Sequence, residues 1–235
     1  SKLKNAKSIL WVLDLWPDIL EELQIIKNKF IIKMLRKTVA YIYENTDLIL
    51  AQSKSFKNII LNNYKVNKVE YFPAWTEEIK KENSDEFISK QTEDKRKLKI
   101  YFTGNIGEAQ NFENIMATAN ILKLNKDIEW TIVGTGRNIE KIKKYKDANK
   151  IDNLHFLGAK SLDKIGFYHR SADILLVSLK PGKALSSTIP GKVQTYLNSN
   201  KFILGFIEGE AKKIIEDAKC GDVVDPNSST KLAEK

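Results

Sequence analysis

The stretch SSTIPGK, residues 186–192, combines residue types that can bind phosphate at the start of a helix. Pro190 suits the first helical turn, where its missing N–H is not needed. Ser187 and Thr188 are placed to accept hydrogen bonds from the free N–H groups of that turn. Lys192 adds positive charge to a helix end that is already electropositive. The stretch therefore predicts an anion site, although an ordinary capped helix explains the same residues.

Glycines follow three apolar runs in the second half of the chain: Gly104, Gly107, Gly134, Gly136 and Gly158. If these runs are parallel strands, their glycine loops meet at one edge of the sheet, together with the loop that leads to Lys192. Glycine is also the usual residue of a tight strand-to-helix turn. Neither the GxGxxG nor the GxxxxGK[ST] pattern is complete. The convergence of several loops on one edge favours a diphosphate site.

The remaining residues with chemical potential are few. His155 and His169 lack metal-ligand spacing to each other or to Cys220, so we predict no metal site. His155 lies within an apolar run and is expected in the core, whereas His169 is expected to cap a helix or face solvent. The single cysteine cannot form an internal disulfide, which fits a reducing cytoplasm.

Composition narrows the class of protein. The chain has 235 residues, 42% of them hydrophobic, so it can form a core and is not a disordered protein. The net charge is +9, but the lysines are scattered and no nucleic-acid-binding motif is present, so we expect no nucleic-acid partner. No apolar run reaches the roughly 18 residues of a membrane span, and no signal peptide is evident, so we expect a cytoplasmic location.

Short apolar runs alternate with amphipathic stretches, as in parallel sheets joined by helical crossovers. Strands are predicted at 8–14, 47–52, 68–74, 97–104, 128–134, 153–158, 173–179, 202–207 and 221–225. Helices are predicted at 22–46, 53–64, 108–125, 137–150, 161–171, 189–200, 209–219 and from 228 onward.

We predict an α/β fold with two Rossmann-like parallel-sheet domains that face a cleft. The first domain covers 1–75 and is partial, because it has only about three strands. The charged segment 76–96 is a linker, and 97–235 is the second domain. We expect the chain to lack an N-terminal portion and to stop early.

The segments FTGNIGEAQNFENI, WTIVGTG, NLHFLGA, ADILLVSL and STIPGKVQTYLNSNKFI follow one another in a familiar order and spacing. They resemble the nucleotide-sugar domain of family 4 glycosyltransferases, which have the B-type two-Rossmann fold, and match best the branch that builds bacterial capsule and O-antigen sugars. LDLWPDIL, DLILAQSKSFKNII and the strand ending at Pro73 resemble the second half of that family's N-terminal domain.

The resemblance implies transfer of a sugar, with retention, from a nucleotide sugar to a glycan or polyprenyl-linked acceptor. It implies a UDP-sugar as donor, no cofactor and no obligatory divalent metal. The donor would contact Gly104, Asn105 and Gly107 at the phosphates, Gly134 at the nucleotide, Lys160 at the base edge, Ser187, Thr188 and Lys192 at the diphosphate or sugar, and Thr195 at the ribose.

The chain departs from the family at two places. Many members carry two glutamates eight positions apart where this chain has Ser187 and Thr195, and many carry an Arg and a Lys after the first glycine loop, which here reads NIGEAQN. Lys192 therefore becomes the main candidate for the cation. No catalytic residue is assigned. Asp14 and Asp18 are candidates for the acceptor side, with a solvated strand end as the equal alternative.

The predicted helix 22–46 is basic and amphipathic. Its apolar residues are Ile25, Ile26, Phe30, Ile31, Met34, Leu35 and Ile42, and they alternate with Lys27, Lys29, Lys33, Arg36 and Lys37. Such a helix can lie on anionic lipid at the inner face of the membrane. Packing against its own sheet explains the apolar residues as well and is the favoured interpretation.

Two other functions remain open. One is a non-catalytic nucleotide-binding fragment. The other is a nucleotide-sugar epimerase of the same fold, which needs carboxylates and histidines in the cleft, and this chain offers few of them.

Overall fold

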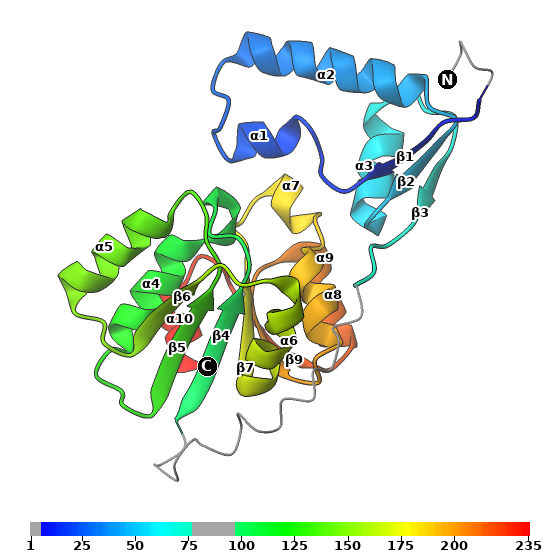
Figure 1. The fold of residues 1–235 in the computed structure, drawn as a ribbon. Coiled ribbons are helices and arrows are strands. Elements are labelled where there is room, and N and C mark those ends of the chain that lie inside the picture. Colours follow the sequence, from blue (N-terminus) through cyan, green and yellow to red (C-terminus); the bar gives the residue numbers. More distant parts are fainter. Residues whose placement is uncertain (1–5, 77–96) are drawn as a thin grey trace.

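The computed structural model of the chain describes residues 6–76 and 97–235. Two parallel sheets organise these residues, one in each half of the chain (Figure 1). The α/β fold with two parallel sheets is therefore confirmed. Apart from Thr76, the predicted linker 76–96 lies outside the described residues.

The smaller sheet consists of β1 (Ile9–Val12), β2 (Leu48–Ala51) and β3 (Val69–Tyr71), in the order β1-β2-β3. Helices α1 (Asp18–Glu22), α2 (Lys29–Glu44) and α3 (Lys54–Asn63) connect the strands. Ser53 caps the start of α3, because its hydroxyl accepts a hydrogen bond from the Phe56 N–H at 2.9 Å. We call residues 6–76 the smaller unit.

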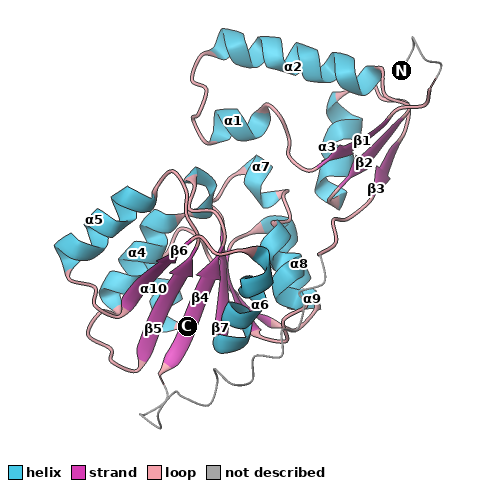
Figure 2. Cartoon of the chain, viewed as in Figure 1, coloured by secondary structure: helices cyan, strands magenta, loops and turns pink. Residues whose placement is uncertain are grey.

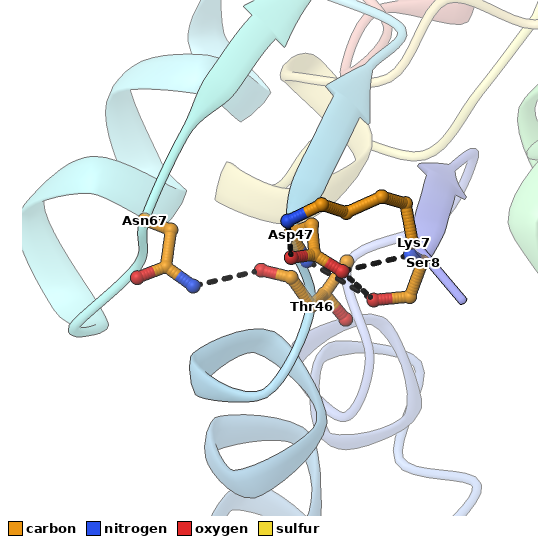
Figure 3. Close-up of polar contacts among 5 residues, drawn as sticks. All are labelled: Lys7, Ser8, Thr46, Asp47 and Asn67. Atoms are coloured by element: carbon orange, nitrogen blue, oxygen red, sulfur yellow. Dashed lines mark hydrogen bonds and ion pairs between the residues drawn. The ribbon is translucent and has the colours of Figure 1, made fainter. Parts of the chain in front are cut away.

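A polar cluster ties the starts of the three strands together (Figure 3). The Asp47 carboxylate accepts hydrogen bonds from the Ser8 N–H at 2.8 Å and the Ser8 hydroxyl at 2.9 Å, and Lys7 pairs with it at 3.3 Å. The Ser8 N–H bond holds the pKa of Asp47 below its usual value. On the other side of β2, the Asn67 amide donates to the Thr46 carbonyl at 3.1 Å. These bonds fix the relative register of neighbouring strands.

The helix predicted at 22–46 begins too early, because α1 ends at Glu22 and α2 covers only Lys29–Glu44. Gln24 adopts a left-handed backbone with φ of 54° after α1. The Asn28 side chain then accepts hydrogen bonds from the N–H groups of Phe30 and Ile31, at 2.9 and 3.4 Å. An asparagine that caps in this way begins a new helix instead of continuing an old one.

The larger sheet contains β4 (Leu98–Thr103), β5 (Ile128–Val133), β6 (Leu154–Gly158), β7 (Ile174–Ser178), β8 (Phe202–Phe206) and β9 (Gly221–Val224). Its order is β6-β5-β4-β7-β8-β9, with all pairs parallel. We call residues 97–235 the larger unit.

Helices cover both faces of the larger sheet (Figure 2). On one face lie α4 (Phe112–Ile121), α5 (Ile139–Asn149) and α10 (Ser229–Glu234), packed against a core that includes Phe102, Trp130 and Phe206. On the other lie α6 (Leu162–Ser171), α8 (Gly191–Leu197) and α9 (Gly209–Asp217). Burial on both faces explains why the strands are almost continuously apolar.

The segment between β7 and α8 folds differently from the prediction. It contains a short helix, α7 (Lys183–Ser186), and α7 contacts the smaller unit. The Glu22 carboxylate accepts hydrogen bonds from the N–H groups of Ala184 and Leu185, at 2.8 and 3.0 Å. The Ser53 hydroxyl donates to the Ser187 carbonyl at 2.7 Å. These bonds join the two units directly.

Candidate functional site

The carboxyl ends of β4, β5 and β6 lie side by side and form one rim. The Gly104 N–H donates to the Val133 carbonyl at 2.8 Å, and the Gly134 N–H donates to the Gly158 carbonyl at 2.9 Å. The predicted convergence of the glycine loops on one edge is therefore confirmed. From β4 the chain adds β5 and β6 on one side of the sheet and then β7, β8 and β9 on the other. Ligands of open parallel sheets bind where the strand order reverses in this way.

Glycine is required at this rim because two backbones touch. Gly134 has φ of +150°, and a Cβ built on it would lie 1.8 Å from the Gly104 carbonyl oxygen. No side chain fits there, so the ends of β4 and β5 approach each other as bare backbone. The result is an open surface of main-chain groups on which a ligand can lie.

A pocket of about 470 Å³ opens at the same rim. Its walls come from the ends of β4, β5 and β6 and from α6 and α8. Six predicted donor-binding residues line it: Gly104, Asn105, Gly134, Lys160, Lys192 and Thr195.

Lys192 contributes a buried amine to this pocket. Its Nζ makes no hydrogen bond within the described parts of the chain and lies 3.6 Å from the centroid of the Phe102 ring. A Cβ on Gly104 would be 3.3 Å from this Nζ, so the lysine reaches over the end of β4. Burial lowers the pKa of Lys192 to about 7. An amine buried without an acceptor is costly, and an anion in the pocket would supply the missing partner.

The pocket floor holds a hydrogen-bond network that the sequence analysis missed. The Thr103 hydroxyl lies 3.0 Å from the His169 Nε2 and 3.2 Å from the Tyr196 hydroxyl. The Thr103 N–H donates to the same tyrosine oxygen at 3.0 Å. Burial lowers the pKa of His169 to about 4 and raises that of Tyr196 to about 12, so both groups are neutral at pH 7. All three residues line the pocket.

Both histidine predictions are wrong. His169 is only 2% exposed, because it lies on the face of α6 that packs toward β4. His155 is exposed, because its side chain lies on the other side of edge strand β6 from the buried Leu154, and its ring lies 3.5 Å from Glu129. The spacing of His169 from Ile165 and Gly166, four and three residues before it, was the available signal for its burial.

Three other predicted donor-binding residues lie outside the pocket. Ser187 donates to the Lys183 carbonyl at 2.8 Å, and Thr188 donates to the Ala184 carbonyl at 2.9 Å. The predicted capping by these hydroxyls is wrong, because the N-cap residue of α8 is Pro190, which has an extended backbone, and no side chain caps the helix. Gly107 lies in a neighbouring hollow, where its N–H donates to the Gln110 side chain at 3.0 Å.

The two acceptor-side candidates are not brought together. Asp14 is exposed after β1, and partial burial raises the pKa of its carboxyl. Asp18 pairs with Arg36 at 2.9 Å and lines a groove of about 780 Å³ between the helices of the smaller unit and α7. Within residues 6–76 and 97–235, no group of three or more His, Cys, Asp or Glu side chains could hold a metal ion.

The model of the family described as "Glycosyl transferases group 1" matches residues 83–235, which include the whole pocket. The Pseudomonas aeruginosa protein named "Probable glycosyltransferase WbjE" is 25% identical over 249 residues, which cover 98% of this chain and 60% of that protein.

Two solved structures share the fold. Anabaena Alr3699/HepE, in complex with UDP and glucose, has a TM-score of 0.78 at 10% identity, with 100% of this chain and 62% of that chain covered. WaaG, a glycosyltransferase involved in lipopolysaccharide biosynthesis, has a TM-score of 0.72 at 14% identity, with 99% and 68% covered. The chain thus spans about 60% of the length of WbjE and HepE.

Proposed function

Because the chain belongs to the glycosyl transferases group 1 family, we propose that its pocket binds the nucleoside diphosphate of a sugar donor, with UDP as the nucleotide. The observation that carries the proposal is the unpartnered, buried amine of Lys192 beside the bare backbone of Gly104. A diphosphate is the ligand that such a site lacks, because it offers several charged oxygens to one amine.

The pocket also suits the rest of a nucleotide. Thr195 lines the pocket, and its hydroxyl donates to the Gly191 carbonyl at 3.1 Å; we assign this residue to the ribose. Lys160 and Ala159 follow β6 and offer backbone groups and one amine to the base. Gly104 and Gly134 let the phosphates approach the main chain closely.

In the proposed reaction, the bond between the sugar and the diphosphate breaks and negative charge develops on the leaving phosphate. Protonated Lys192 stabilises that charge as it grows, which lowers the barrier. The acceptor hydroxyl oxygen forms the new bond to the sugar with retention, its proton passes to the oxygen of the leaving diphosphate, and no metal ion is required. The acceptor is a cell-surface glycan or a polyprenyl-linked precursor in the cytoplasm. The involvement of WaaG in lipopolysaccharide biosynthesis supports this class of acceptor.

The donor class is tested by calorimetric titration of the chain with UDP, UDP-N-acetylglucosamine and GDP-mannose. We expect UDP compounds to bind and GDP-mannose to bind more weakly. Replacing Lys192 with alanine should weaken UDP binding by roughly 1.5–3 kcal/mol, the size of a charge-assisted hydrogen bond. An unchanged affinity of the alanine variant for UDP would contradict the proposal that Lys192 binds the diphosphate. Binding without sugar transfer to any glycan or polyprenyl acceptor would leave a nucleotide-binding module.

A further inference from the structure

The Tyr196 hydroxyl lies where two strands of the larger sheet separate. β4 pairs with β5 along its whole length, but it pairs with β7 only through Ile100 and Tyr101. Successive residues of a strand point their N–H groups to opposite sides, and the Gly104 N–H donates to β5, so the Thr103 N–H points toward β7. There it donates to the Tyr196 hydroxyl at 3.0 Å. The tyrosine thus takes the place of a strand partner.

The same hydroxyl belongs to a chain of hydrogen bonds with a defined direction. The Tyr196 oxygen accepts from the Thr103 N–H, so its own proton goes to the Thr103 hydroxyl at 3.2 Å, which is nearer than the Thr103 carbonyl at 3.5 Å. The Thr103 hydroxyl in turn donates to the His169 Nε2 at 3.0 Å. His169 accepts this proton because it is neutral at pH 7, since burial lowers its pKa to about 4. The chain links α8, β4 and α6 beneath the pocket.

The position of Lys192 depends on this link. Lys192 lies four residues before Tyr196 on α8, so the two side chains leave the same face of the helix. Tyr196 fixes that face against Thr103, and Lys192 reaches over the ring of the adjacent Phe102, with 3.6 Å between Nζ and the ring centroid. Within the described residues, the amine has no hydrogen bond that could fix it there. Its place is therefore set by the helix that carries it.

The other contacts of α8 constrain the helix less. Val193, the second buried residue of this helix, packs in the same core, and apolar contacts have no preferred direction. The Thr195 hydroxyl lies 3.2 Å from the Thr76 hydroxyl. Neither contact is a hydrogen bond to β4. The bonds between Tyr196 and Thr103 are the directional contacts that join α8 to the strand end.

We propose that Tyr196 is a positioning residue of the donor site, whose hydroxyl sets the place of the Lys192 amine through its hydrogen bonds to Thr103. The inference rests on the proposed binding of a diphosphate by Lys192. Tyr196 acts through the lysine, because its single proton is already donated and is not available to a phosphate. The benefit is preorganisation, since an amine already placed at the rim loses little side-chain entropy when the ligand binds.

The first test compares Tyr196→Phe with the wild type in calorimetric titrations with UDP. Phenylalanine keeps the ring and removes the hydroxyl, so α8 loses its link to β4 and the Lys192 amine moves into water. At pH 6 most of the amine is protonated in both proteins. Affinity should fall about tenfold there, because binding must restore a placement that one net hydrogen bond provided.

The same titrations at pH 9 separate positioning from a general structural effect. Burial lowers the pKa of Lys192 to about 7, and an amine released into water has a higher pKa. The affinity of Tyr196→Phe should therefore fall less steeply with pH, and the gap between the two proteins should narrow to less than about threefold at pH 9. A deformed site would lower the affinity by the same factor at both pH values.

The neighbouring titratable groups do not produce this convergence. Those that line the pocket with Lys192 are Lys160 after β6, His169 on α6 and Tyr196 itself. Lys160 is present in both proteins, so its contribution cancels in the comparison. The pKa values of about 4 for His169 and about 12 for Tyr196 lie outside the range from pH 6 to pH 9.

A second measurement needs no nucleotide. The free energy of unfolding is measured between pH 7 and pH 10.5 for Lys192 and for Lys192→Met, each in the wild-type and the Tyr196→Phe background. The difference between the two curves reports the burial of the amine, because a buried amine has a lower pKa than the same amine in the unfolded chain. This difference should shrink in the Tyr196→Phe background.

Tyr101→Phe is the matched control. Tyr101 is half-buried on β4, packs against the same core and is not among the residues that line the pocket. Its affinity for UDP should equal that of the wild type at both pH values. Thr103→Val is a second variant, which keeps the N–H bond to Tyr196 and removes the hydroxyl that Tyr196 and His169 share. Its affinity at pH 6 should fall about threefold.

The proposal fails if Tyr196→Phe binds UDP like the wild type at both pH values, or if its affinity falls by one constant factor at both. It also fails if the Lys192-dependent difference in unfolding is the same in the two backgrounds. Should Tyr196→Phe not fold, wild-type affinity of Thr103→Val would overturn it. A wild type that binds no UDP refutes the donor site instead, and the unfolding measurement still tests whether Tyr196 places Lys192.

Discussion

Replacing Lys192 with methionine should raise the stability of the free protein and weaken its binding of UDP. Methionine keeps the length of the side chain over Phe102 but removes the amine, which has no acceptor within the described residues. The same group would thus cost stability in the free protein and contribute affinity in the complex, as expected of a residue placed for a ligand.

The magnitude follows from the pKa. Burial lowers the pKa of Lys192 from 10.5 to about 7, and each pH unit of such a shift corresponds to about 1.4 kcal/mol. The unfolded chain binds the proton more tightly, so the wild-type free energy of unfolding should rise as the pH increases from 7 to 10.5. The full rise in the free energy of unfolding, from pH values below 7 to values above 10.5, is on the order of 5 kcal/mol. The methionine variant should lack this rise.

The binding of UDP should show the reverse dependence. If the diphosphate binds the protonated amine, the fraction of competent protein falls about tenfold per unit above pH 7, and UDP affinity should fall about fiftyfold between pH 7 and pH 9. With pKa values of about 4 for His169 and about 12 for Tyr196, neither neighbour titrates in this window.

The assay is calorimetry in buffers of different ionisation enthalpy, which counts the protons taken up with UDP. The wild type should take up nearly one proton per UDP at pH 8.5, and Lys192→Met should take up none. Lys164→Met, at an exposed lysine of α6 outside the pocket, is the matched control and should behave like the wild type. A wild-type affinity that is flat from pH 7 to 9, or a slope retained by Lys192→Met, would refute the reasoning.

Three further predictions concern stability. Gly134→Ala should cost more than about 3 kcal/mol and abolish UDP binding, because its Cβ would lie 1.8 Å from the Gly104 carbonyl oxygen, whereas Gly191→Ala, with nothing within 4 Å, should be neutral or slightly stabilising in urea unfolding. Glu22→Ala should lower the free energy of unfolding by about 1–3 kcal/mol, because it leaves two N–H groups of α7 without their acceptor, and limited proteolysis should then separate the two units faster. Since burial lowers the pKa of His169 from 6.5 to about 4, the wild type should lose about 3 kcal/mol more stability than His169→Leu as the pH falls from 6.5 to 4, measured by urea unfolding at each pH.

The arrangement of the sheets was predictable because the local pattern and the topology depend on the same residues. Apolar runs such as 128–134 and 173–179 can be buried on both sides only in a parallel sheet covered by helices. Once the strands are parallel, Gly104, Gly134 and Gly158 must meet at one edge. The placement of Lys192 beside them followed from the same geometry.

The errors have a common physical origin in competition between hydrogen bonds. Asn28 interrupts the predicted long helix because its side chain accepts hydrogen bonds from the first N–H groups of α2. These bonds compete with the backbone hydrogen bonds that would continue one helix through this residue. Ser187 and Thr188 are well placed to cap α8 in the sequence, but α7 offers carbonyls four residues earlier, and the hydroxyls donate there instead.

His169 was missed for a different reason. Its burial depends on the crossing of α6 over β4, a contact between residues 66 positions apart in the chain. The spacing of His169 from Ile165 and Gly166 places it on the inward face of α6, but no local pattern identifies Thr103 as the partner of its ring.

The hydrogen bond from Ser53 to the Ser187 carbonyl has a mechanical consequence. Ser53 begins α3 in the smaller unit, and Ser187 lies five residues before Lys192 on a continuous stretch of backbone. A hinge rotation of one unit against the other must therefore either break this hydrogen bond or displace α8, the helix that carries the Lys192 amine. The affinity of the pocket for its ligand and the angle between the two units are then coupled. A contact that fixes the angle changes the affinity, and a ligand in the pocket restricts the angle by the same free energy.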